Sequence, residues 1–436
     1  MPTAGGLYYA STVLAPEGYS ALAAWFVGWS NFCGFVTAPC SVNYALAAML
    51  VTCGEISNPN YVAQTWHIYL TLLLLLVIQG VVTMQSTWFI GWVNKIGTIF
   101  NIIVVIIFVI WFPAGSINHP KTNHSHQVWT SFENGTEWPI GWATIMGFLT
   151  TIWTMSGYDA PFHLSEECSN ANIASPRAIV MTAQSGLYLG FAVILVIVYT
   201  VQDITDVVAG QYGQPFGSLC LQVLGKKAGL AMFSLNIIAQ FFVGQGCTIT
   251  ATRVVFAFAR DGALPGSKWW SHVDRRTKTP VFATWGVLTV AALLSLLMFA
   301  SPVAIGAVFS IGAIAQYTSF TTPVALKLFF DRGRFKPGKH AATILLHTFR
   351  LTFSRPVESG TIFKASGRCC RVLVAYHYPR SLLSGREGCR FDPTDDELDL
   401  SDLWWRYAPC HVILRHLWAE VVQGSQDQRR FHQCQS

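Results

Sequence analysis

The sequence predicts an all-α membrane protein, a polytopic bundle of transmembrane helices. The 436 residues are 52% apolar and only 11% charged, less than half of the roughly 25% that is typical of soluble domains. The apolar residues also form long runs, and about 20 such residues cross a bilayer core as a helix. None of the runs alternates between apolar and polar residues as a strand of a membrane barrel does.

Eight such runs precede residue 330, each bounded by charges, proline or asparagine. Because backbone groups in lipid must be paired within their own segment, each run is expected to be a helix. The predicted helices run over Tyr19–Val51, Trp66–Met84, Val93–Phe112, Ile140–Ser156, Ile179–Val201, Ala228–Phe258, Phe282–Phe299 and Ala304–Phe329.

Lysine and arginine in the short loops predict the orientation of the bundle, because cytoplasmic loops carry an excess of both. The set assigned to the cytoplasm, together with Met1, is Lys95, Arg177, Arg260, Lys268, Arg275, Arg276, Lys278, Lys327, Arg332 and Arg334. The opposite side carries Lys121, Lys226 and Lys227. Two glycosylation sequons, at Asn123 and Asn134, fall in a loop assigned to the outside. The net charge of +6 is therefore interpreted as a topology signal, and no nucleic-acid partner is expected.

The sequence contains no motif that indicates a metal site, a cofactor site or an enzyme active site. The eleven cysteines are scattered, with Cys369 and Cys370 adjacent and no paired CxxC spacing. No phosphate loop and no paired nucleophile and base stand out. We predict that the chain is not an enzyme and binds no cofactor.

The most informative segment begins at the inner half of the fourth apolar run. Gly157 and Pro161 bracket a short polar stretch, and this pairing predicts a break in the helix. Broken helices persist at membrane depth where the freed backbone groups face a cavity or bind a ligand. The predicted substrate-lining residues are Ser156, Gly157, Tyr158, Asp159 and Ala160. An ordinary helix that ends at proline, with Asp159 as a cap, is the alternative.

Ionisable residues at membrane depth are functional candidates by default. Asp159 could receive a substrate ammonium group, or it could lie at the cytoplasmic mouth and pair with Arg177. Glu166 and Glu167 follow in the loop, and with Arg177 they are candidates for ion pairs of a cytoplasmic gate. Solvated acids at the start of a helix are the alternative interpretation for both glutamates.

Four motifs occur in order along the chain. They are GYDAPFHLSEECSNANIASPRAI at 157–179, FFVGQG at 241–246, ARDGALP at 259–265 and SIGAIAQYTSFTTP at 310–323. Together they resemble fungal permeases for γ-aminobutyrate, amino acids and choline, which belong to the amino acid, polyamine and organocation transporter superfamily. The resemblance covers residues 1–338.

The resemblance implies a five-plus-five inverted-repeat fold with substrate held between two broken helices. It also implies alternating-access transport of an amino acid or γ-aminobutyrate, with a proton as co-substrate and the lipid bilayer as surroundings. The alternatives are a choline or amine permease and a non-transporting membrane sensor of the same fold. The expected location is the plasma membrane, with the vacuolar membrane as the alternative.

Both ends of the chain depart from the family pattern. The opening at Met1–Tyr9 resembles the loop before the third family helix, so residues 1–338 are expected to form an incomplete core with family helices 3 to 10. Residues 339–436 lack helical or strand periodicity. If the codons of this tail are read in a shifted frame, they can encode apolar segments of the kind that form membrane helices. This suggests that an intron was retained and that translation then continued out of frame. We expect this tail to be disordered and the literal chain not to transport.

Overall fold

The structure, a computed structural model, describes residues 5–330 apart from 59, 119–122, 131–133, 169 and 211. Within these residues the chain forms helices and no strand, which confirms the all-α bundle. The predicted tail at 339–436 lies outside the described residues, so its boundary and its origin stay predictions. The five-plus-five repeat likewise stays what the resemblance implies.

Seven of the described helices are long and apolar enough to cross a membrane. They are α2 (Ser20–Ser57), α3 (Thr65–Thr83), α4 (Thr87–Gly115), α8 (Ala171–Thr200), α10 (Pro215–Arg260), α12 (Val281–Ser295, continued by η3, Leu296–Phe299) and α13 (Pro302–Phe330). The apolar helix α6 (Ile140–Thr154) is shorter, with 15 residues. Each of the eight predicted runs coincides with one of these helices.

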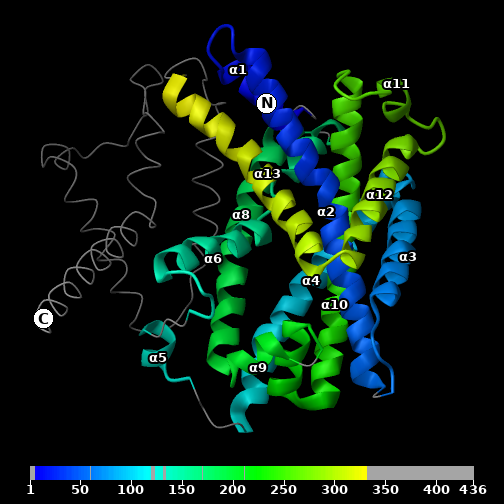
Figure 1. The fold of residues 1–436 in the computed structure, drawn as a ribbon. Coiled ribbons are helices and arrows are strands. Elements are labelled where there is room, and N and C mark those ends of the chain that lie inside the picture. Colours follow the sequence, from blue (N-terminus) through cyan, green and yellow to red (C-terminus); the bar gives the residue numbers. More distant parts are fainter. Residues whose placement is uncertain are drawn as a thin grey trace, which may run out of the picture. The chain divides into compact units, whose positions relative to one another are not determined.

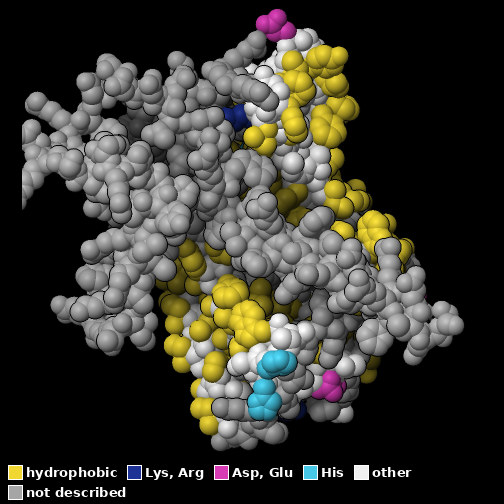
Figure 2. Space-filling view, turned by 90° about the vertical axis from the view of Figure 1, so that its left-hand side faces the viewer, with side chains coloured by type: hydrophobic (Ala, Val, Ile, Leu, Met, Phe, Trp, Pro, Cys, Tyr) yellow, Lys and Arg dark blue, Asp and Glu magenta, His cyan; other side chains and the backbone are white. Residues whose placement is uncertain are grey.

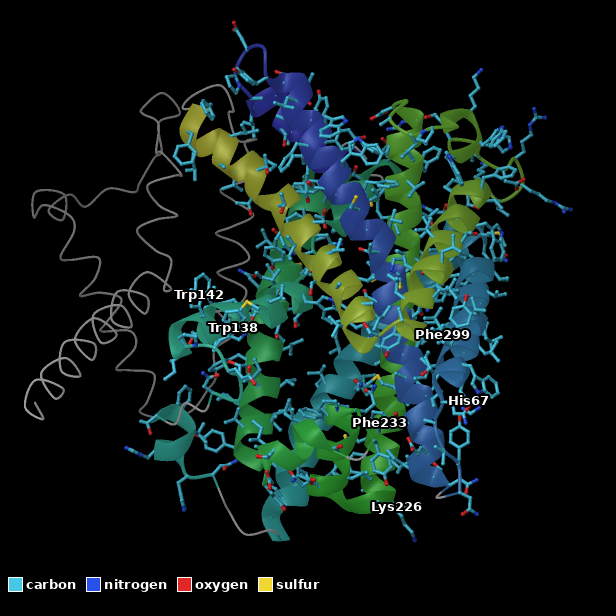
Figure 3. The ribbon with its side chains drawn as sticks, in the orientation of Figure 1. His67, Trp138, Trp142, Lys226, Phe233 and Phe299 are labelled. Atoms are coloured by element: carbon cyan, nitrogen blue, oxygen red, sulfur yellow. The ribbon has the colours of Figure 1, made fainter. Side chains whose placement is uncertain are left out.

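Short helices lie between the long ones. They are α1 (Gly6–Leu14), η1 (Ser116–Asn118), α5 (Ser125–Thr130), α7 (Ala160–His163), η2 (Ser165–Glu167), α9 (Ile204–Ala209) and α11 (Ser267–Trp270). The helix α1 and the loop around α11 lie at one end of the bundle, and α5 and α9 lie at the other (Figure 1). Lys226 extends from the end opposite the N-terminus (Figure 3). This arrangement agrees with the predicted partition of charges between the two ends.

Three long helices begin earlier than predicted, and the first of them, α4, starts at Thr87 and not at Val93. The helix α8 starts at Ala171 and not at Ile179, because its first turns carry polar residues that give no hydropathy signal. The helix α10 starts at Pro215 and not at Ala228. Gly225 has a φ of 74° there, a left-handed conformation that glycine adopts without strain, and it joins two helical segments across a kink.

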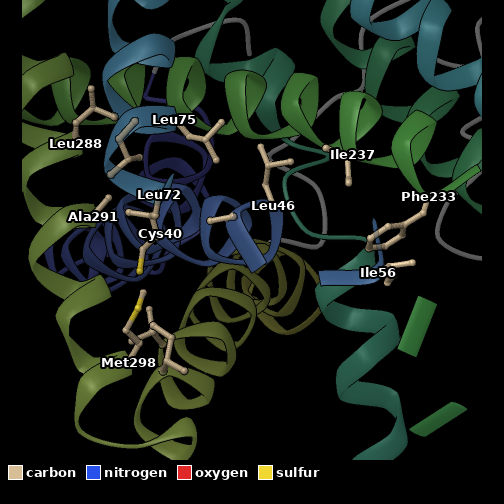
Figure 4. Close-up of a cluster of buried hydrophobic side chains, with 14 residues drawn as sticks. Cys40, Leu46, Ile56, Leu72, Leu75, Phe233, Ile237, Leu288, Ala291 and Met298 are labelled. Atoms are coloured by element: carbon tan, nitrogen blue, oxygen red, sulfur yellow. The ribbon is translucent and has the colours of Figure 1, made fainter. Parts of the chain in front are cut away.

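The helix α2 runs through the middle of the bundle and packs against α10, α13, α3, α12 and α1. Around it lies the main apolar core, which includes Cys40, Leu46, Leu72, Leu75, Phe233, Ile237, Leu288 and Met298 (Figure 4). Apolar side chains also cover much of the outer surface (Figure 2), as expected where helices face lipid.

A buried polar network joins α2, α3 and α10 inside this core. Asn43 donates to Gln79 Oε1 at 2.9 Å, and Gln79 returns a hydrogen bond to Asn43 Oδ1 at 2.8 Å. Thr248 donates to the same Gln79 oxygen at 3.0 Å, and Gln245 donates to Thr83 at 2.8 Å. All five side chains are buried. Interhelical hydrogen bonds of this kind fix the register of helices where apolar packing alone is not selective.

We predict that Gln79→Leu lowers the stability of the bundle by about 1–3 kcal/mol, because the buried Asn43 Oδ1 loses its donor and the hydrogen bonds from Asn43 and Thr248 to Gln79 are lost. Gln85→Leu is the matched control, since Gln85 is exposed and, among the described residues, its side chain bonds to Val81 O alone; its effect should stay within about 0.5 kcal/mol. Thermal unfolding in detergent measures both. Equal effects of the two variants would contradict the structural role of the network.

Candidate substrate and gating site

The predicted helix break is present. The helix α6 ends at Thr154, and Gly157 follows with a φ of 81°, in the left-handed region that other residues enter at a cost of about 1–2 kcal/mol. A new helix, α7, begins at Ala160 with Pro161 in its first turn and lasts only four residues. The break therefore arises from Gly157 and Pro161, as predicted.

Aromatic side chains line one side of the break. The Tyr158 ring lies 4.6 Å from the ring of Phe320 on α13, centroid to centroid. Tyr317, on the same helix, lies 5.4 Å from Phe320. The hydroxyl of Ser156 donates to the carbonyl of Ile152 at 3.0 Å. Three aromatic rings and the carboxyl end of α6 are thus brought to one place.

Asp159 lies on the other side of the break and is almost completely buried, with 1% of its surface exposed. Its Oδ2 accepts from Asn31 Nδ2 of α2 at 3.2 Å and lies 3.3 Å from His163 Nε2. Asn31 Nδ2 also donates to Ser319 Oγ of α13 at 3.3 Å. The ring of Phe35 packs edge-on against His163 at 5.1 Å. Asp159 therefore ties the broken segment to two neighbouring helices.

The two alternatives for Asp159 do not hold in this geometry. Although Asp159 immediately precedes α7, its side chain makes no capping hydrogen bond. Arg177 is exposed on α8, and within the described part of the chain it forms no ion pair with Asp159. The carboxylate is instead buried between Asn31 of α2 and His163 of α7.

Glu166 and Glu167 do form ion pairs, and their partners are arginines of α10. Glu167 Oε1 accepts from Arg253 Nε at 2.7 Å, and Arg253 is buried, with 5% exposed. Glu166 accepts twice from Arg260, at 2.7 and 3.1 Å, and both side chains of this second pair are exposed. Among the described residues Arg177 joins neither pair, so the predicted grouping of Arg177 with the two glutamates is not observed.

Helix α1 closes the same end of the bundle. The Tyr8 hydroxyl donates to Asp261 Oδ2 at 2.6 Å, and Asp261 lies 3.6 Å from Arg260 Nε. Burial raises the pKa of Tyr8, and the hydrogen bond to Asp261 raises it further, so the hydroxyl keeps its proton and remains a donor. Through these contacts α1, η2 and the end of α10 form one network.

The two sequons differ in their surroundings. Asn123 Nδ2, the atom that would carry a glycan, donates to the carbonyls of Val198 and Val201 at 2.8 and 2.6 Å, at the end of α8. Asn134 Nδ2 also donates to a carbonyl, that of Trp138 at 2.7 Å, and its Oδ1 accepts from the backbone and the hydroxyl of Thr136 at 3.0 and 2.7 Å. The difference between the two sites is exposure, since Asn134 is exposed and Asn123 is half-buried, and this difference favours Asn134 as the acceptor.

Sequence reasoning missed four residues of this region: Asn31, His163, Arg253 and Ser319. Arg253 could have been found, because it is a charge inside a long apolar run. His163 lies one helical turn after Asp159, a spacing that brings side chains together. Asn31 and Ser319 carry no local signal, since only the tertiary fold brings Asn31 of α2 to Asp159 and Ser319 of α13 to Asn31. Within the described residues no group of His, Cys, Asp and Glu side chains is arranged to hold a metal.

We predict that Glu167→Gln destabilises the protein by about 2–4 kcal/mol, because it leaves the Arg253 charge buried without its counter-ion. Glu166→Gln is the matched control at the adjacent position. Its partner Arg260 is far more exposed, so the loss should be below about 1 kcal/mol. The difference in apparent melting temperature in detergent tests this order, and the reverse order would contradict the structure.

We also predict that Asn134→Gln removes a glycan in a secretory-pathway host, whereas Asn123→Gln leaves the electrophoretic mobility unchanged. Digestion with an endoglycosidase followed by mobility analysis reads the result. The opposite result, in which endoglycosidase changes the mobility of Asn134→Gln but not of Asn123→Gln, would contradict the prediction. It would mean that Asn123 is modified before its contacts with α8 form.

Comparison with known proteins gives the family. Residues 1–357 match the amino acid permease family. The chain is 44% identical to an uncharacterised amino-acid permease of Schizosaccharomyces pombe, over 78% of this chain and 63% of that protein. It is 36% identical to a proposed polyamine transporter of Candida albicans, over 77% of this chain and 62% of that protein. It is 28% identical to a GABA-specific permease of Saccharomyces cerevisiae, over 78% of this chain and 60% of that protein.

The chain thus spans less than two thirds of the length of these relatives. The match to a permease family confirms the resemblance drawn from the motifs and the prediction that the chain is not an enzyme. Together with the seven long apolar helices, it identifies a multi-pass membrane protein. The chain belongs to the amino acid permease family.

Proposed function

We propose that the protein serves transmembrane transport of an amino acid or a related small amine, and that the break at Ser156–Ala160 forms one wall of the substrate site. The observation that carries this proposal is the left-handed Gly157 between α6 and α7. It interrupts a helix of a permease-family chain beside three aromatic rings. A backbone break within an apolar helix is tolerated where it lines a cavity or binds a ligand.

The carboxyl end of α6 supports an amine as the group that is recognised. The last carbonyls of a helix carry a partial negative charge and attract cations. In α6 these carbonyls end directly at the break, and half-helix ends of this kind hold ions and substrates in transporters. Those of Thr151, Ile152 and Trp153 already accept from Met155 and Ser156, so an ammonium group there would be attracted by the partial negative charge of the helix end.

The aromatic set supports the same chemistry. The ring of Phe320 contacts the rings of both Tyr158 and Tyr317, and aromatic faces attract cations by about 0.5–2 kcal/mol. The relatives are named for amino acids, a polyamine and GABA, all of which carry an ammonium group. We therefore propose amino acids, γ-aminobutyrate and small amines as the substrate class. The proposed location of the transporter is the plasma membrane.

The ion pairs of α10 support a gate at the cytoplasmic end. Glu166 and Glu167 lie a few residues after the break and hold η2 to α10 through Arg260 and Arg253. In alternating access, η2 and α10 would have to move apart at this end when substrate is released to the cytoplasm. The pairs are hence proposed to stabilise the closed state, with the buried Arg253 pair contributing most.

The test compares two glycine variants in substrate binding. A Cβ at Gly157 meets no atom within 4 Å, so Gly157→Ala acts only through its positive φ, at a cost of about 1–2 kcal/mol. Binding of radiolabelled amino acids, γ-aminobutyrate and amines to the purified chain in nanodiscs should weaken by about 5- to 30-fold.

Gly147→Ala is the matched control. Gly147 lies inside α6, where an added Cβ also meets no atom within 4 Å, and it has no positive φ. Its substitution should leave binding unchanged. Equal binding by Gly157→Ala and the unmodified chain would contradict a substrate site at the break. Absence of binding for every compound of the panel would contradict the proposed substrate class.

A further inference from the structure

The connection between α10 and α12 carries a concentrated positive charge. Residues 266–280, named here the basic loop, contain four basic side chains and one acidic side chain, Asp274. The four basic residues, all of them exposed, are Lys268, Arg275, Arg276 and Lys278. Within the described part of the chain none of the four takes part in an ion pair. Their charge is therefore available to an anion outside the protein.

Hydrogen bonds fix the shape of the basic loop. Asp274 Oδ2 accepts from the backbone amides of Arg276 and Thr277 at 3.0 Å each, and the amide of Lys278 donates to the carbonyl of Asp274 at 3.0 Å. The acidic residue of the loop thus shapes the turn and is not paired with a basic side chain. Thr279 Oγ1 donates to the carbonyl of Met84 at 3.1 Å, which fastens the loop to the turn between α3 and α4.

The last two residues of α11 have different surroundings. Trp270 Nε1 donates to the carbonyl of Pro265 at 2.9 Å, and its ring lies so close to Gly286 of α12 that an added Cβ there would overlap it. Trp269, the residue before, is 74% exposed. Trp270 therefore holds α11 against the bundle, whereas Trp269 presents a large amphipathic ring to the surroundings. Such rings are enriched at the boundary between membrane and water.

The neighbouring turn between α3 and α4 indicates where the surface of the bilayer lies. Trp88 and Trp92, in the first two turns of α4, are 73% and 47% exposed and pack edge-on with ring centroids 6.1 Å apart. Lys95 Nζ lies 5.1 Å from the centroid of the Trp92 ring. Exposed tryptophans at the end of a membrane helix belong to the aromatic belt at the headgroup level. Because Thr279 joins the basic loop to this turn, the loop lies near the same level.

We propose that the basic loop is a binding site for anionic phospholipids, in which the four basic side chains attract the phosphate-bearing headgroup and Trp269 inserts beside it into the interface. The charge pattern assigns this end of the bundle to the cytoplasm, and the cytoplasmic leaflet is the one that carries anionic lipids. Clusters of four or more lysines and arginines directly beside a membrane helix are typical of such sites.

Charge complementarity selects the lipid over an apolar protein partner. A loop that served only to orient the chain in the membrane would need its lysines and arginines. It would need neither a turn built on Asp274 nor an exposed tryptophan next to Lys268. The lipid site goes beyond the proposed transport function and does not depend on it, because lipid binding and substrate binding are measured separately on the same chain.

Native mass spectrometry of the full chain in a neutral detergent tests the site. The protein is titrated with phosphatidylserine and with phosphatidylcholine of the same acyl chains. Each lysine or arginine near an anionic lipid strengthens binding by about fivefold, so the double variant Arg275→Gln and Arg276→Gln should bind phosphatidylserine about 30-fold more weakly. Its binding of phosphatidylcholine should not change. Within the described residues neither side chain forms a hydrogen bond or an ion pair, so the variant should fold normally.

The double variant Lys226→Gln and Lys227→Gln is the matched control. These two lysines are adjacent and exposed, they lie at the opposite end of the bundle (Figure 3), and their loss changes the net charge by the same amount. Phosphatidylserine should bind this variant as tightly as it binds the unmodified chain. Equal losses in the two double variants would overturn the proposal, because binding would then follow net charge and not the basic loop.

Trp269→Ala separates a lipid from a soluble phosphate compound. The variant should bind phosphatidylserine more weakly but bind glycerophosphoserine, the same headgroup without acyl chains, as the unmodified chain does. Glycerophosphoserine that binds the unmodified chain as tightly as phosphatidylserine would overturn the lipid site in favour of a soluble ligand. An unmodified chain that does not prefer phosphatidylserine to phosphatidylcholine would also overturn it, whatever the outcome of the substrate-binding test.

Discussion

Every backbone amide and carbonyl that lies in lipid needs a partner within the protein, and this constraint organises the molecule. It restricts the described chain to helices, and it makes any interruption of a helix costly unless neighbouring groups compensate. The chain contains such an interruption at Met155–Asp159, between α6 and α7. Asn31 of α2 and Phe320 of α13 contact the interrupted residues, and α7 packs against α8, α10 and α1.

The buried polar groups fall into two classes with different consequences. Around Gln79 the side chains of Asn43 and Thr248 meet partners across α2, α3 and α10, and hydrogen bonds of this kind make the packing of the helices specific. Around Asp159, oxygens of Asp159 and Asn31 have no partner among the described residues, and the same holds for Gln245 Oε1 in the cluster around Gln79. The two clusters differ in their setting, because the Gln79 cluster joins three long helices, whereas Asp159 lies at a break between α6 and α7.

Sequence alone was sufficient for the long helices and for the break, because both depend on local composition. Apolar length predicts each membrane helix, and Gly157 with Pro161 predicts the interruption. The start of α10 was missed because Lys226 and Lys227 interrupt the apolar pattern, although the helix continues on both sides of Gly225. The partners of Asp159 and Glu167 could not be predicted, since Asn31, Ser319 and Arg253 are more than 80 residues away in the chain and meet them only through tertiary packing.

The central claim is that the broken segment binds an ammonium-bearing substrate. Hydrogen–deuterium exchange of the amides of Ser156–Ala160, with and without a saturating amine or amino acid, tests it most directly. We expect these amides to exchange faster than those of α3 at Leu72–Leu76, and substrate to slow them selectively. Substrate binding that leaves the exchange of Ser156–Ala160 unchanged while protecting another helix would contradict it.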